Sequence, residues 1–325
     1  MKIKIPNLFL ALAWLALPTL VSAQFSFTTN NGIITITGYN TAAGLNVVIP
    51  AATNGFPVTS IGADAFEFKS ITNVTIPNSV TSIGEDAFGY CDGLTNATIP
   101  NSVTNLGDFA LGDCASLTSV TIGTGVTSIR EGVFEYCTGL TNVTIGNSVT
   151  GIAYEAFEEC YSLTSVTIPS NVTNIEGYAF GDCTSLANVT IPNSVTNIGD
   201  GAFGGCTSLK SAYFQGNAPP DYGDAFTSDP AVVYYLTGTI GWGSTFGGVP
   251  AVLWNPQANT SGFTGGQFRF NLTGPANAVI VVEASTNLSN PVWLPVATNT
   301  FSASRTSTFS DPSGYPSRFY RFRSP

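Results

Sequence analysis

The sequence contains no histidine, one methionine and few charged residues, with 10 Lys and Arg against 20 Asp and Glu among 325 residues. Without histidine the chain cannot build a Ser-His-Asp or Cys-His nucleophile system or a histidine-ligated metal site. Nucleic acid is an unexpected partner, because neutralising phosphates requires clustered Lys and Arg. The composition therefore predicts no enzymatic activity, no cofactor and no nucleic-acid partner.

Paired carboxylates are the catalytic groups that this composition leaves. The densest acidic cluster is Glu158 and Glu159 with Glu135, which lies 23 residues earlier. These positions vary between successive repeats of the chain, and this favours a solvated face over an active site. No Asp-x-Asp-x-Asp-Gly spacing indicates a calcium loop. We expect no catalytic site and no metal site.

Long apolar runs are also scarce, and the one that exists lies at the N-terminus. Lys2 and Lys4 precede an apolar run over residues 8–20, and Val21-Ser22-Ala23 supplies the small residues of a cleavage site. A membrane helix needs about 20 apolar residues with suitable flanks. We therefore predict a signal peptide over residues 1–23, and a mature protein that is secreted or held at the cell surface without a transmembrane segment.

Cysteine occurs six times at an unbroken interval of 23 residues. A fixed period of 20 to 50 residues is typical of a stacked solenoid, whereas metal and disulfide frameworks have uneven gaps. Buried free thiols are the favoured interpretation, because equivalent side chains in a stack point the same way and a disulfide needs facing Cβ atoms. Isolated disulfides remain an alternative. The structural ladder consists of Cys91, Cys114, Cys137, Cys160, Cys183 and Cys206.

Other residue columns keep the same period. Each repeat carries the pattern L-x-x-V-x-I, followed in several repeats by proline, a second short extended run and a Gly-acidic-x-Ala-Phe segment. Proline ends a strand because it cannot donate to the ladder, and acidic residues suit the start of a short helix. The pattern predicts strand, turn, strand and helical turn in each coil. One coil buries too little to fold alone, so coils must stack and be capped.

The unit A-F-x-x-C-x-x-L-x-x-V-x-I-P-x-S-V-x-x-I-G resembles the BspA-like, or Treponema-type, leucine-rich repeat family over about residues 25–254. The resemblance implies a right-handed, curved leucine-rich-repeat solenoid in a secreted or surface protein of a bacterium. Adhesion or protein binding is the implied role. It implies no catalytic residues.

Irregular spacing marks the expected boundaries. We predict an N-terminal cap over 24–57, leucine-rich repeats over 58–216, an aromatic C-terminal cap over 217–254, a linker over 255–262 and a small antiparallel β-sandwich over 263–325. Strands of the sandwich are expected at 268–272, 279–284, 292–297, 307–310 and 318–322. The net charge is −15 over residues 24–254 and +3 over residues 255–325.

The exposed alternation of the first strand supplies the candidate binding face. An unbroken threonine column is flanked by Asn and Ser, and it ends in an aromatic residue. The structural explanation is that threonine favours strands and pairs with itself across them. The functional explanation is a recognition surface for an extracellular protein or glycan, acting through many weak contacts. Its members are Thr75, Thr98, Thr121, Thr144, Thr167, Thr190, Asn96, Asn142 and Tyr213.

A second-choice face lies on the helical edge, where aromatic and acidic residues alternate: Tyr136, Glu135, Glu158, Glu159 and Tyr161. Two other roles compete with binding. The solenoid could be a structural spacer that displays the C-terminal module. Regular threonine rows also resemble those of ice-binding β-solenoids, although leucine-rich repeats curve whereas ice-binding faces are flat. The sequence leaves the oligomeric state open.

Overall fold

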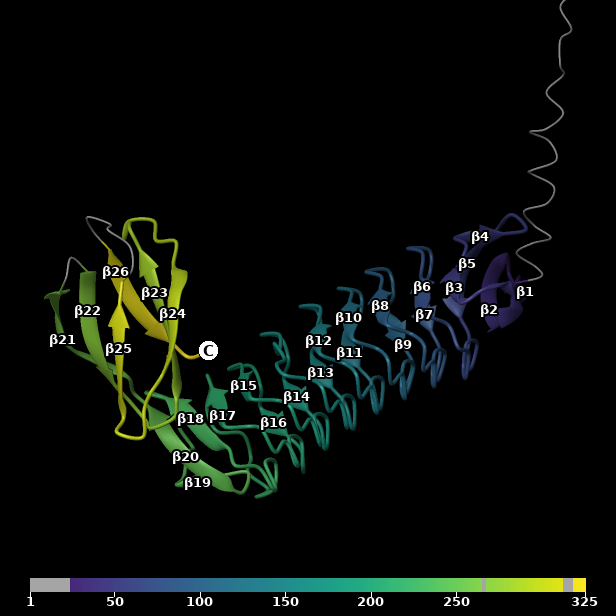
Figure 1. Cartoon of the computed structure of the whole chain (residues 1–325). Helices are drawn as coiled ribbons and strands as arrows, with labels where there is room; N and C mark the ends of the chain where they lie inside the picture. The colour runs from purple at the N-terminus through teal and green to yellow at the C-terminus, as the bar shows by residue number, and fades with distance from the viewer. Residues whose placement is uncertain (1–23, 265–266, 312–317) are drawn as a thin grey trace, which may run out of the picture.

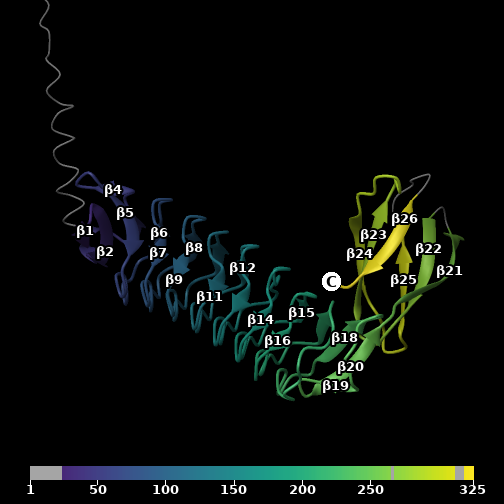
Figure 2. The same cartoon turned by 180° about the vertical axis from the view of Figure 1, so that it is seen from behind.

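The computed structural model describes residues 24–264, 267–311 and 318–325, so the predicted signal peptide lies outside the described residues. The chain is mainly β, as predicted. A long solenoid is followed by a β-sandwich that stands at its C-terminal end, and the two together form a hook (Figures 1 and 2). No helix in the described part is long and apolar enough to span a membrane.

A hairpin closes the N-terminal end of the solenoid. Its strands β1 (Phe25–Asn30) and β2 (Ile33–Tyr39) pair antiparallel, and β2 then pairs parallel with β5 (Phe56–Ile61). The ring of Tyr39 packs on that of Phe66 in the first repeat, with 5.5 Å between the ring centroids. The remaining elements of this cap are η1 (Thr41–Ala43), β3 (Asn46–Val48) and β4 (Ala52–Thr53).

Most coils contribute two short strands, one to each of two parallel stacks. The stack on the inner side of the hook contains β6 (Asn73–Thr75), β8 (Asn96–Ile99), β10 (Ser119–Ile122), β12 (Asn142–Thr144), β15 (Asn188–Ile191) and β17 (Ser211–Phe214). The other stack contains β7 (Ser82–Ile83), β9 (Asn105–Leu106), β11 (Ser128–Ile129), β13 (Gly151–Ile152), β14 (Asn174–Ile175) and β16 (Asn197–Ile198).

The register of both stacks follows the 23-residue period. Val120 lies opposite Ala97 on one side and Val143 on the other, so equivalent residues of successive coils face each other. The inner stack is interrupted at residues 165–168, where a single bridge joins Thr167 to Thr190. The sequence period therefore predicts the stacking register, although not this interruption.

The third side of each coil is a run of tight turns where the sequence predicts a short helical turn. Two columns of residues in this run have positive φ, for example Asp86 at 49° and Tyr90 at 56°. Left-handed residues break helical geometry. The alternate N–H groups bond to the next coil instead, as from Phe66 to the carbonyl of Ala87 at 2.8 Å. Within the described part of the chain, η1 (Thr41–Ala43) is the only helical element.

Phenylalanine and cysteine fill the core beneath these turns. Phe157 stacks on Phe134 and Phe180, each at 5.2 Å between ring centroids. Full burial of one such side chain contributes roughly 1.5–3 kcal/mol. The six cysteines are free and buried, in agreement with the favoured interpretation of their spacing.

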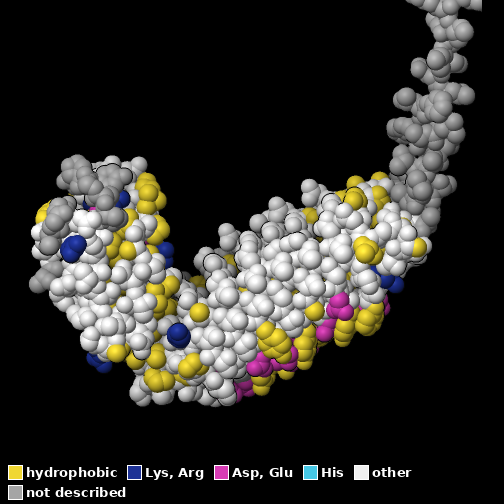
Figure 3. Space-filling model, in the orientation of Figure 1, with side chains coloured by type: hydrophobic (Ala, Val, Ile, Leu, Met, Phe, Trp, Pro, Cys, Tyr) yellow, Lys and Arg dark blue, Asp and Glu magenta, His cyan; other side chains and the backbone are white. Residues whose placement is uncertain are grey.

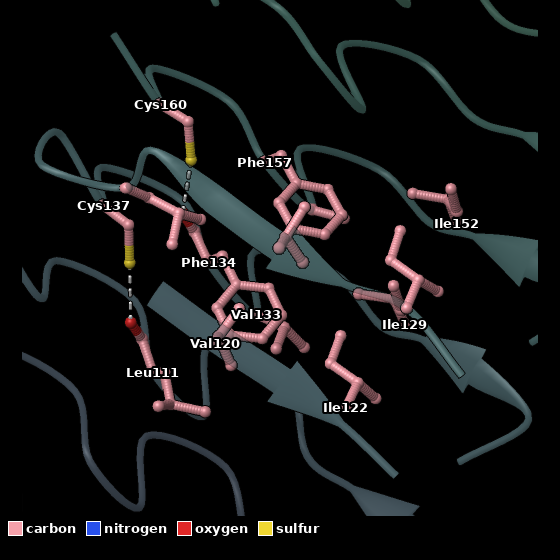
Figure 4. Packing of buried hydrophobic residues seen from close by; sticks show 14 of the residues in the cluster. Leu111, Val120, Ile122, Ile129, Val133, Phe134, Cys137, Ile152, Phe157 and Cys160 are labelled. Carbon is pink, nitrogen blue, oxygen red and sulfur yellow. Dashed lines mark hydrogen bonds between the residues drawn. The ribbon is translucent and has the colours of Figure 1, made fainter. Parts of the chain in front are cut away.

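Each thiol donates to a main-chain carbonyl of the preceding coil. Cys137 Sγ lies 3.2 Å from Leu111 O, and Cys160 Sγ lies 3.3 Å from Phe134 O (Figure 4). Burial raises the pKa of Cys137 to about 12, so this thiol is a poor nucleophile at neutral pH. The ladder therefore supplies packing and intercoil hydrogen bonds.

The C-terminal end continues into the sandwich through β18 (Val232–Leu236), β19 (Thr245–Phe246) and β20 (Val249–Trp254). One sheet of the sandwich has the order β21-β22-β25 and the other β24-β23-β26, both antiparallel. Their bounds are Gln257–Thr264, Gln267–Thr273, Val279–Ser285, Leu294–Thr300, Thr306–Ser310 and Phe319–Arg323 for β21 to β26.

Two details differ from the sequence prediction. The segment 255–262, expected to be a linker, lies mostly in β21, which pairs with β22. The sandwich also shares a core with the end of the solenoid, since Tyr213, Tyr234 and Trp254 pack with buried residues of the sandwich. The indole of Trp254 donates to Val279 O at 3.3 Å. This shared core holds the sandwich on the side of the solenoid that carries the inner stack of strands (Figure 1).

Candidate binding groove on the inner face

The inner row consists of the threonine column on the inner stack of strands. Its side chains alternate with buried Val and Ile residues, as expected when one face of a strand covers the core. Thr75, Thr98, Thr121, Thr144 and Thr167 are exposed, and Thr190 is half-buried. The predicted candidate face is thus a continuous column on the side of the solenoid where the sandwich stands (Figure 1).

Three threonine rows run along the solenoid, and their hydroxyl groups are used differently. The entry row lies just before the inner strands and consists of Thr72, Thr95, Thr118 and Thr141. In this row, Thr118 Oγ1 donates to Thr95 O at 3.0 Å, and Thr141 Oγ1 donates to Thr118 O at 3.0 Å. The outer row lies on the other stack of strands and consists of Thr81, Thr104, Thr127, Thr150, Thr173 and Thr196. It makes the same kind of bond, since Thr150 Oγ1 donates to Thr127 O at 3.1 Å. These hydroxyl groups tie successive coils together.

The inner row makes no such bonds. Within the described residues, the hydroxyl groups of Thr75, Thr98, Thr121, Thr144 and Thr167 have no protein partner, and only Thr190 donates, to Pro325 O at 2.8 Å. An exposed hydroxyl can both donate and accept. The inner row is therefore the threonine row with free hydrogen-bonding capacity.

The groove on the inner face has two separate sections, which lie at turns that follow inner-strand residues. One section of about 570 Å³ runs from Asn78 to Asn147 and lies between the inner row and a column of Asn and Thr side chains. Its floor contains Pro100, then Gly123 and Gly146, where other coils carry Pro77, Pro169 and Pro192. The section thus includes two successive coils that carry glycine in place of this proline.

A separate section lies farther along the inner face, next to the sandwich. This second section, of about 490 Å³, is lined by Thr167, Thr190 and neighbouring residues, together with Arg323 and Pro325 of the sandwich. Arg323 is already paired, with its Nε 2.7 Å from Glu283 Oε1. Burial alone would raise the pKa of Glu283, but hydrogen bonds from Arg323 and Arg321 hold it below its ordinary value. The sandwich therefore borders this section with Arg323, which shares the carboxylate of Glu283 with Arg321.

The structure corrects one predicted member of the binding face. Tyr213 continues the threonine column, but its side chain is only 1% exposed, and its hydroxyl accepts a hydrogen bond from the N–H of Val279. It belongs to the core shared with the sandwich and is not available to a partner. Asn96 and Asn142 are exposed beside the row, and Asn96 accepts from Ser119 Oγ at 2.5 Å.

The second-choice face, here called the acidic edge, lies on the turns. Acidic and hydrophobic side chains gather there along the lower border of the solenoid in Figure 3. Carboxylate oxygens of Glu135, Glu155 and Glu158 lie within 4.8 Å of one another. Desolvation by burial, followed by repulsion from Glu155, raises the pKa of Glu135 and of Glu158 to about 7. These two carboxyl groups are partly protonated near neutral pH.

The predicted membership of this cluster needs a correction. Glu155 joins Glu135 and Glu158, whereas Glu159 turns away and accepts a hydrogen bond from Tyr161 Oη. A side-chain hydrogen bond to Glu159 also raises the pKa of Tyr136. Carboxylate oxygens are ligands that calcium accepts, but exposed acidic groups of this kind commonly hold no ion. The polar groups of the acidic edge are engaged mainly with one another.

Sequence reasoning missed the most distinctive part of the groove. The exchange of proline for glycine at Gly123 and Gly146 is visible in the repeat alignment, and it marks the floor of the larger section. The entry row was also missed, although Thr72, Thr95, Thr118 and Thr141 keep the same period. The first signal is a break in a repeat column and the second is a complete column, and both can be found in the sequence without a structure.

Comparison with known proteins identifies the repeats. The model of the BspA type leucine rich repeat region matches residues 59–186 and 151–228, in six copies. No curated protein matches the chain. Among solved structures, a leucine-rich repeat protein of T. pallidum is 26% identical and aligns over 70% of this chain and 89% of its own length, with a TM-score of 0.46.

Two further solved structures are similar. A leucine-rich repeat protein of Eubacterium ventriosum is 27% identical over 57% of this chain, with a TM-score of 0.50, and the alignment spans 50% of its length. One from Bacteroides ovatus is 24% identical over 65% of this chain and 70% of its own, with a TM-score of 0.45. The family match and the Eubacterium ventriosum structure support the solenoid fold.

Proposed function

This chain belongs to the BspA-type leucine-rich repeat family, and we propose that it is a non-enzymatic binding protein that recognises an extracellular protein or glycan through its inner face. The observation that supports this most strongly is the unequal use of the threonine rows. Most entry-row and outer-row hydroxyl groups bond to the preceding coil, as those of Thr118 and Thr150 do, whereas those of Thr98, Thr121 and Thr144 have no partner within the described residues and line the groove.

Binding through this row relies on repetition. Interface hot spots are usually Trp, Tyr or Arg, and the exposed part of the inner row contains none of them. Each coil can add only a weak polar contact, so useful affinity requires several coils to act on one ligand. A long or repeating partner fits this arrangement better than a small compact one.

The proposed location is outside the cytoplasm, secreted or at the cell surface. The support is the pattern of residues 1–23, in which two lysines, an apolar run and small residues follow one another. Buried, hydrogen-bonded thiols are also compatible with an oxidising compartment.

The test compares two triple variants that carry the same added charge. Thr121→Glu, Thr144→Glu and Thr167→Glu alter the inner row. Thr127→Glu, Thr150→Glu and Thr173→Glu alter the outer row of the same coils as a control. Immobilised full chain is screened against a glycan array and against extracellular proteins of surrounding cells. We expect the inner-row variant to lose its bound partners and the outer-row variant to keep them.

Retention of every partner by the inner-row variant would refute the proposal. Absence of any partner for the wild-type chain would favour the structural spacer instead. Thermal hysteresis of the wild-type chain would favour the ice-binding role.

A further inference from the structure

The section of the inner groove above Gly123 and Gly146 has a specific chemistry. We infer that it is a subsite for a neutral, linear oligosaccharide that lies along the stack of coils. This inference rests on the proposed function, and it names the ligand class and the part of the inner face that holds it.

Glycine shapes the floor of the subsite. A Cβ atom on Gly123 would lie 2.6 Å from the carbonyl carbon of Pro100, and one on Gly146 would lie 2.8 Å from Gly123 O. Both distances are shorter than a Cβ contact tolerates, so glycine is what permits the coils to stack this closely.

The lining carries no charge. Its polar side chains are hydroxyl and carboxamide groups: Thr98, Thr121, Thr124, Thr144, Asn78, Asn101 and Asn147. A charged ligand would lose hydration without gaining an ionic partner here. A neutral ligand has no such cost.

The lining also matches sugar hydroxyl groups in donor and acceptor character. A threonine hydroxyl donates once and accepts, and an asparagine carboxamide presents both kinds of group. Sugar hydroxyl groups likewise do both, so each ring can exchange hydrogen bonds with Thr121 or its equivalents. The side chains of this section therefore suit a ligand rich in hydroxyl groups.

The geometry disfavours an extended peptide as the ligand. A peptide that adds to a sheet needs an open strand edge, but β10 is already paired with β8 on one side and β12 on the other. The section also offers no aromatic pocket for an anchoring side chain. A peptide could therefore pair its main chain only with side-chain hydroxyl and carboxamide groups here and not with a strand edge.

The repeat supplies a matching period. Paired strands lie about 4.8 Å apart, so Thr98, Thr121 and Thr144 present equivalent hydroxyl groups at that interval. The rings of an extended β-1,4-linked chain advance by a similar distance. Successive rings can therefore meet equivalent groups on successive coils.

The experiment titrates the full chain calorimetrically with linear hexasaccharides. The neutral probes are 1,4-linked hexasaccharides of glucose, in the α and the β form, and of xylose, mannose and N-acetylglucosamine. Hexagalacturonate is the acidic counterpart. Thr121→Trp fills the section with an indole. Thr127→Trp places the same side chain on the outer row of the same coil as the matched control. Thr121→Val removes only the hydroxyl group.

We expect at least one neutral hexasaccharide to bind and hexagalacturonate not to bind. Thr121→Trp should weaken that binding at least tenfold, Thr121→Val about fivefold for the loss of one hydrogen bond, and Thr127→Trp should leave it unchanged. Urea unfolding midpoints of the variants establish that each is folded.

Three results would overturn the inference. Failure of all neutral hexasaccharides to bind would remove the ligand class, while capture of a protein that depends on the inner row would still sustain the proposed function. Preference for hexagalacturonate would contradict the uncharged lining. Sugar binding that Thr121→Trp does not weaken would place the subsite elsewhere.

Discussion

The inner face and the acidic edge are built from the same coils, yet their polar groups are arranged in opposite ways. On the inner face, the hydroxyl groups of Thr121 and Thr144 lack a partner within the described chain and border a groove. On the acidic edge, Glu159 accepts a hydrogen bond from Tyr161, and the carboxylate oxygens of Glu135 and Glu158 lie within 4.8 Å of each other with raised pKa values. Both regions lie at the surface, so unmet hydrogen-bonding capacity is the better indicator of a binding face.

The largest effect on the free energy of unfolding is expected in the core. The phenylalanine side chains buried beneath the acidic edge are larger than the Val and Ile side chains buried beneath the inner face. Phe157→Ala, beneath the acidic edge, should lower the free energy of unfolding by about 3–5 kcal/mol, because it removes a ring stacked on both sides. Val143→Ala, beneath the inner face, should cost about 1.5–3 kcal/mol. Urea unfolding measures both. Equal losses would mean that the phenylalanine stack adds nothing beyond aliphatic packing.

The cysteine ladder beneath the acidic edge gives the next effect. Cys137→Ala removes the hydrogen bond to Leu111 O and leaves a small cavity, so a loss of about 1–3 kcal/mol is expected. Alkylation at pH 8 should leave all six native thiols unmodified and should label all six after unfolding. Mass spectrometry counts the labels. Native labelling of Cys137 would contradict its burial and its raised pKa.

A smaller difference in the free energy of unfolding is expected between variants of two threonines in one coil. Thr118→Val removes a hydroxyl bonded to Thr95 O at 3.0 Å and should cost about 0.5–1.5 kcal/mol. Thr121→Val removes a hydroxyl without a protein partner in the described residues and should leave the free energy of unfolding nearly unchanged. Equilibrium unfolding of the two single variants tests the contrast. Equal costs for both would show that the inner row also holds the coils together.

The smallest expected effect concerns the pH dependence of the acidic edge. The folded-state pKa of Glu135 and Glu158 is about 7, above the ordinary value of 4.5, so their protonated forms stabilise the fold below pH 4.5. That contribution falls as the pH rises through about 7. The urea midpoint should therefore be lower at pH 8 than at pH 5. The double variant Glu135→Gln, Glu158→Gln should show a shallower dependence, and an unchanged slope would contradict the account.

The sequence predicts the solenoid well because every coil repeats the same local and intercoil constraints. The columns of Leu, Val and Ile fix the register, and the cysteine spacing predicts equivalent positions in the core. The turn conformations could not be predicted, since left-handed φ at residues such as Tyr90 and Phe109 is set by bonding to the next coil.

The remaining errors lie where distant segments meet. Tyr213 occupies a column of exposed threonines, but its burial depends on Val279, 66 residues later. Segment 255–262 has the composition of a linker, and its strand forms because β22 pairs with it. The inner row itself was predicted from alternation alone, whereas its groove depends on the local exchange of proline for glycine.

Hydrogen exchange measured with and without a bound neutral hexasaccharide tests the central claim most directly, because it reports on both regions in one experiment. We predict slower amide exchange in peptides that contain residues 98–101, 121–124 and 144–147, with no change in those that contain Tyr136 and Glu159. Protection confined to the acidic edge would contradict the assignment of the inner face as the binding surface.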